Sequence, residues 1–132
     1  MKKFDEVEKE LYGAIINEQA AYEMAQVGKA GGVEIWVWPR EGGYTPHFHF
    51  WNTDKTISGC IKLESAEYFE HGQYKSKLDT HQRRQLVAFL KANSKNFPGL
   101  TNWQTIIGIW NSSNPQKTID LNTPMPNYLE LK

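Results

Sequence analysis

The sequence predicts an α+β fold: an antiparallel meander sheet of three to four strands, packed by two C-terminal helices, with an N-terminal helical extension. The spacing of apolar residues is helical at the start of the chain, strand-like in the middle and helical again in the last third. We expect a single domain, with the helical extension at 1–30, the core α+β unit at 33–120 and an extended tail at 121–132.

The first segment has the apolar period of an amphipathic helix. Phe4, Val7, Leu11 and Ile15 recur every three or four residues, so they would line one face. Gly28, followed shortly by two more glycines, would end the helix.

Short runs rich in β-branched and aromatic residues predict the strands. In the third run, alternation would bury Ile61 and Leu63 and place Cys60 and Lys62 on the opposite face. The segments expected to form the meander, the last of them returning as a hairpin, are 33–38, 47–51, 57–65 and 67–71.

Two helices follow, at 79–95 and 101–111, and each opens with a capping-box pattern. In such a box a polar residue before the helix and a glutamine three positions later bond each other's backbone N–H groups. The pairs are Asp79 with Gln82 and Thr101 with Gln104. The buried stripes would be Leu86, Phe89 and Leu90 in the first helix and Trp103, Ile106, Ile107 and Trp110 in the second.

The stretch TPHFHFWN holds the main functional candidates. Alternate residues of a strand point the same way, so His47 and His49 would share one face while Phe48 and Phe50 take the other. If the phenylalanines face the helices, the two imidazoles face solvent or a groove.

Two imidazoles on one strand face can bind one divalent transition metal ion, provided that further ligands complete the site. His71 is our choice as third ligand, and Glu67 and His81 are alternatives. The competing interpretation is that His47 and His49 only pack or hydrogen-bond, because two histidines separated by one residue are common without a metal.

The order of four segments resembles a bacterial domain family of unknown function that has a Pro-His-Phe-His signature. These segments are TPHFHFWN, ISGCIKLES, HQRRQLVAFLKANSK and TNWQTIIGIWN. The resemblance covers about residues 33–120. It implies a small partner protein, because members are often encoded in gene pairs that look like toxin–antitoxin modules. The signature positions in this sequence are Pro46, His47, Phe48, His49, Arg84, Asn102 and Trp103.

Charge is zero in sum but unevenly distributed. Residues 75–95 hold six basic side chains against one acidic, a local charge of +5, and residues 34–70 hold six acidic against three basic, a local charge of −3. A basic helical face can meet an acidic protein or, as a less favoured reading, nucleic acid; a solvated helix face is the ordinary alternative. The predicted binding surface consists of Arg83, Arg84, Lys91, Lys95 and Trp51.

These observations favour a small cytoplasmic interaction module of unknown biochemical activity, resembling one member of a toxin–antitoxin-like pair. The alternative is a metal-dependent enzyme, a hydrolase or nuclease, that uses His47 and His49. No apolar run approaches the length of a membrane span. Cys60 is the only cysteine, which excludes an internal disulfide and is compatible with a reducing compartment.

Overall fold

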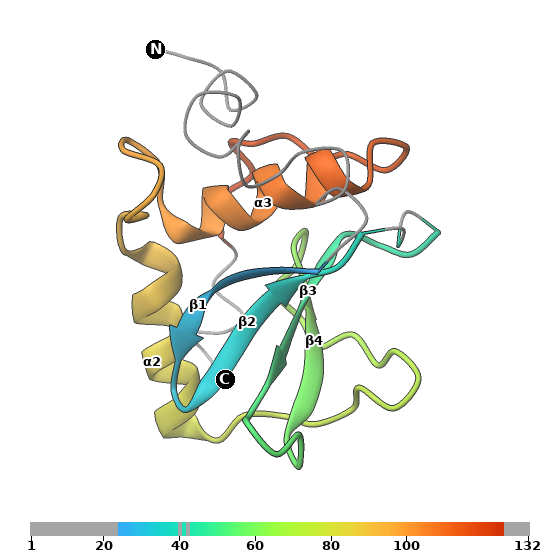
Figure 1. The fold of residues 1–132 in the computed structure, drawn as a ribbon, viewed down its shortest axis with the longest axis vertical. Helices are drawn as coiled ribbons and strands as arrows, with labels where there is room; N and C mark the ends of the chain where they lie inside the picture. The colour runs from blue at the N-terminus through green and yellow to red at the C-terminus, as the bar shows by residue number, and fades with distance from the viewer. Residues whose placement is uncertain (1–23, 40, 42, 126–132) are drawn as a thin grey trace.

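A computed structural model describes residues 24–39, 41 and 43–125, which form a four-stranded sheet and two helices (Figure 1). The strands are β1 (Ala25–Ala30), β2 (Val33–Val37), β3 (His47–Trp51) and β4 (Ser58–Lys62). The helices are α2 (Thr80–Lys91) and α3 (Asn102–Ser113).

The sheet is the predicted antiparallel meander, with strand order β1-β2-β3-β4. Gly31 and Gly32 connect β1 to β2 and have φ angles of 60° and 79°. A tight hairpin turn needs positive φ at both central positions, a conformation that glycine adopts without steric cost. The glycine pair therefore sets the register in which Ala30 lies opposite Val33.

Residues 25–30 correct the prediction of a helix that continues to Gly28. They form β1, because the glycines that follow close a hairpin onto β2 instead of ending a helix. The helical spacing predicted earlier in the extension, and the tail after residue 125, lie outside the described residues.

The predicted strand at 67–71 is also wrong. This segment makes only isolated bridges, between Ile61 and Tyr68 and between His71 and Tyr74, so it is a loop that covers the edge of β4. The sheet still has four strands, because residues 25–30 supply one of them as β1.

Both capping boxes are confirmed. Asp79 accepts a hydrogen bond from the backbone N–H of Gln82 while the Gln82 side chain accepts one from that of Asp79, and Thr101 and Gln104 do the same for α3. Helix α2 ends at Lys91, four residues before the predicted end at residue 95, because Ala92 adopts an extended conformation.

The core lies between the sheet and the two helices. In Figure 1, α2 runs beside β1 and α3 crosses the ends of the strands, and both helices contact β1. The fully buried side chains include Ile35, Phe48, Phe50, Ile61, Leu86, Leu90, Ile106, Ile107 and Trp110. None of the helices that the structure describes has the length and apolar character needed to cross a bilayer.

Candidate metal centre

His47 and His49 lie side by side on β3, as the alternation of the strand predicts. Their ring centroids are 5.0 Å apart, and Phe48 and Phe50 are buried in the core on the other side. Of the two expected surroundings, solvent or a groove, solvent is excluded, since His47 is 1% exposed and His49 is 0% exposed.

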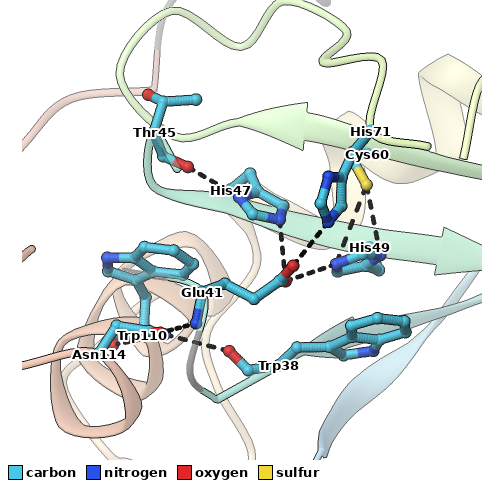
Figure 2. Close-up of polar contacts among 9 residues, drawn as sticks. All are labelled: Trp38, Glu41, Thr45, His47, His49, Cys60, His71, Trp110 and Asn114. Carbon is cyan, nitrogen blue, oxygen red and sulfur yellow. Dashed lines mark hydrogen bonds and ion pairs between the residues drawn. The ribbon is translucent and has the colours of Figure 1, made fainter. Parts of the chain in front are cut away.

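The carboxylate of Glu41 explains why two imidazoles can be buried here. Its Oε1 lies 3.0 Å from Nε2 of His47 and 2.8 Å from Nε2 of His49. Its Oε2 lies 2.7 Å from Nε2 of His71 (Figure 2). Three imidazole nitrogens therefore converge on one carboxylate.

Glu41 belongs to the connection between β2 and β3. Pro39 follows β2 and cannot donate to a sheet ladder, so the chain leaves the sheet there. A turn in which the N–H of Tyr44 donates to the carbonyl of Glu41, at 3.0 Å, then brings the chain back toward β3.

His71 comes from the loop that follows β4, and a short bridge with Tyr74 across Gly72 presents it to the other ligands. Its ring stacks on Phe69 with an interplanar angle of 8° and a centroid distance of 5.5 Å. Tyr44 meets the same ring edge-on at 4.3 Å. The structure thus brings His71, the predicted third ligand, close to His47 and His49, although the segment that carries it is a loop.

The hydrogen bond made by Nδ1 of His47 determines which of the two ring nitrogens carries the proton in the neutral ring. Nδ1 is 2.7 Å from the carbonyl oxygen of Thr45, which can only accept, so Nδ1 carries a hydrogen. In the neutral ring, Nε2 then presents a lone pair to the Glu41 oxygen. That contact is a hydrogen bond when the ring holds two protons or when Glu41 holds one; with neither proton, the two atoms are both acceptors.

His49 is enclosed by aromatic rings and a thiol. Trp38 stacks on it at 4.0 Å, and Tyr74 meets it edge-on at 4.9 Å. Burial lowers the pKa of His49 below its ordinary value, in spite of the Glu41 carboxylate. The neutral ring is the form that binds metals.

Cys60 lies on the same side of the sheet, with its Sγ 3.3 Å from Nδ1 of His49. Burial raises the pKa of this thiol, so the sulfur keeps its proton at neutral pH. Cys60 was predicted on the face away from the core; it does lie there, but it is buried against His49.

Burial alone would raise the pKa of Glu41. The hydrogen bonds with His47 and His49 outweigh it and hold the pKa well below the ordinary value. Glu41 is therefore a carboxylate at neutral pH. Among the described residues, the donor atoms of Glu41, His47, His49 and His71 form a group in which all lie within 4.8 Å of one another.

The other predicted ligands lie elsewhere. His81 is exposed on α2, where its Nε2 is 3.0 Å from the side-chain amide of Gln85, and Glu67 is exposed on the loop after β4. Neither residue belongs to the four-residue group.

The predicted binding surface divides into two parts. Arg84, Lys91 and Lys95 are exposed on α2 or just beyond it, whereas Arg83 is half-buried and donates to the Thr80 hydroxyl. Trp51 is 5% exposed and stacks on Trp36 on the histidine side of the sheet.

Glu41 is the site residue that the sequence does not single out, because it is one of six acidic residues in the segment 34–70. The signal in the sequence is an acidic residue in a glycine-rich turn. This turn joins the predicted strands 33–38 and 47–51, and Glu41 lies six positions before His47.

No family model, curated protein or solved structure matches the chain. The resemblance to the Pro-His-Phe-His family therefore stays a prediction, and the function has to be argued from the geometry of the site.

Proposed function

We propose that the protein binds one divalent transition metal ion through Glu41, His47, His49 and His71. The observation that carries this proposal is the convergence of three imidazole Nε2 atoms on one buried carboxylate, with all four donor atoms close together.

A metal ion bound to both His47 Nε2 and Glu41 Oε1 would remove the repulsion between these two acceptor atoms. Its Nδ1–H is committed to the Thr45 carbonyl, so Nε2 is free to be a ligand. Metal-bound histidines commonly donate their second ring N–H to a backbone carbonyl in this way. Without a cation, a neutral His47 would direct a lone pair at a carboxylate oxygen 3.0 Å away.

The donor set favours a transition metal over calcium or magnesium. Imidazole nitrogen suits zinc, iron, nickel and copper, and the added carboxylate also accommodates manganese, whereas calcium and magnesium prefer oxygen ligands. Bonds of about 2.0–2.1 Å would place neighbouring donors roughly 3.0–3.4 Å apart. The closest nitrogen–oxygen pairs, at 2.7–3.0 Å, would have to separate only slightly.

Access to the metal would come from the side of His71. The side chains of His47 and His49 are fully buried, while those of Glu41 and His71 are 9% and 16% exposed. Tyr44, which packs on His71, is 46% exposed. A water or substrate oxygen reaching the ion from this side could be polarised, the chemistry that a metal-dependent hydrolase or nuclease requires.

The test is metal binding by untagged protein. We expect one zinc, manganese or iron ion per chain by elemental analysis, loss of the ion in a His47→Ala, His49→Ala variant, and retention in His81→Ala, which removes an exposed histidine outside the group. Sub-stoichiometric binding by the wild-type protein, after incubation with each metal in turn, would overturn the proposal.

We propose as a second candidate that the protein is a small interaction module whose basic face binds an acidic partner. The supporting observation is that Arg84, Lys91 and Lys95 are exposed on α2 and just beyond it. This surface is distinct from the four-residue group, so both proposals can hold for one molecule.

A further inference from the structure

Asn114 is a fully buried polar side chain that follows α3 directly, and it uses both ends of its amide (Figure 2). Its Oδ1 accepts a hydrogen bond of 2.6 Å from the backbone N–H of Glu41. Its Nδ2 donates to the carbonyls of Trp38 and Trp110, at 3.1 Å and 3.3 Å. Burying an amide is costly unless its donors and acceptor are satisfied, and here they are.

These hydrogen bonds hold the backbone at Trp38 and at Glu41, two residues whose side chains contact the histidines. Trp38 supplies the ring that stacks on His49, and Glu41 supplies the carboxylate. Trp110, the third partner, lies with its ring 5.3 Å from that of His47. The side chain that directly follows α3 therefore braces the connection that carries Glu41.

We infer that Asn114 is a positioning residue of the metal centre, because it holds the backbone of Glu41 where its carboxylate meets the three imidazoles. The inference rests on the proposed metal site. Glu41 has three rotatable side-chain bonds and lies in a turn, so its position depends on how firmly its backbone is held. Removing an outer-shell partner of this kind typically weakens metal affinity about 10- to 100-fold.

Asn111, in the last turn of α3, provides a matched control. Its amide also clamps the backbone, donating to the Ile119 carbonyl at 2.8 Å and accepting from the Ile119 N–H at 2.9 Å. Those bonds hold the segment after α3 and touch no member of the metal group.

The experiment compares Asn114→Ala with Asn111→Ala in the full chain. We expect the dissociation constant for Zn²⁺, measured by chelator competition, to rise about 10- to 100-fold in Asn114→Ala and to stay at the wild-type value in Asn111→Ala. Urea denaturation of both proteins confirms that each is folded during the measurement. Equal Zn²⁺ affinity in the wild type and both alanine variants would overturn the inference.

A second measurement uses the wild type alone and decides the matter if Asn114→Ala does not fold. Coupling between two sites is reciprocal, so a bond that favours metal binding must itself be strengthened by the metal. Hydrogen exchange at the Glu41 amide should therefore slow when Zn²⁺ is added, and an unchanged rate would overturn the inference. A wild-type protein that binds no Zn²⁺, Mn²⁺ or Fe²⁺ would instead refute the metal site itself, before any variant is compared.

Discussion

Glu41 connects the three histidines, because each of its two oxygens is in contact with imidazole nitrogen. A buried carboxylate without such partners would become protonated, and buried imidazoles without an acceptor would leave their N–H groups unsatisfied. The metal-free cluster is thus held together by the same four residues that would bind the ion. Its electrostatics should be visible in the stability of the metal-free protein.

The ionised form of Glu41 stabilises the folded state, because its pKa is lower there than the value of 4.5 expected in the unfolded chain. This contribution is complete above the unfolded pKa and is lost as the pH falls below it toward the folded pKa. We expect the free energy of unfolding of the wild type, minus that of Glu41→Gln, to decrease as the pH falls below 4.5. Urea denaturation in the presence of a chelator measures it, and a difference that is constant through this range would contradict the prediction.

Sequence reasoning at the residue level could predict orientation but not the whole site. The alternation of a strand places His47 and His49 together, and this follows from backbone geometry alone. The position of Glu41 depends on a turn and on a hydrogen bond from a residue 73 positions away, which no local pattern contains. The burial of the histidines depends on Glu41, so a sequence prediction that does not place Glu41 cannot predict that burial.

Among the elements, those with a local cause were predicted well and those with a distant cause were not. Each helix begins at a capping box, which needs only four residues in sequence. The sequence predicts helix where β1 forms because Gly31 and Gly32 can equally well stop a helix or close a hairpin, and only pairing with β2 decides between the two. The segment at 67–71 has strand-like composition, yet it pairs with β4 only at an isolated bridge.

The packing of β4 gives a prediction at this scale. A Cβ atom on Gly59 would overlap the Phe50 ring and the Ser76 carbonyl oxygen, while one on Gly43 would have no atom within 4 Å. Since overpacking a core typically costs about 1–3 kcal/mol, Gly59→Ala should lower the free energy of unfolding by about that amount. Gly43→Ala is the control and should change it little. Equal stability of the two variants by urea denaturation would contradict the prediction.

At the scale of the whole molecule, charge is separated even though the total is zero. Three members of the metal group lie in the acidic segment 34–70 and His71 directly follows it, whereas the basic residues of 75–95 lie on and around α2. Electrostatic attraction acts over about 10 Å at moderate ionic strength, so a basic face influences which partners approach the protein.

If the basic face binds an acidic partner, reversing its charge should abolish binding. We expect a protein captured from a lysate of the host by the wild type to be lost when Arg84, Lys91 and Lys95 are changed to glutamate. The control changes three other exposed lysines, Lys29, Lys55 and Lys117, to glutamate and should retain the partner. Mass spectrometry of the captured proteins is the measurement. No partner for the wild type, or equal loss in both variants, would contradict the prediction, and recovery of nucleic acid instead would favour the other class of partner.

The hydrogen bond between Glu41 and Asn114 also has a consequence for biosynthesis. His71 is the last of the four ligands and lies 43 positions before Asn114, so the ribosome releases all four ligands before it releases their brace. If the brace acts as inferred, a nascent or truncated chain that ends before α3 carries every ligand and still holds the ion poorly. Uptake of the metal would then distinguish finished molecules from fragments.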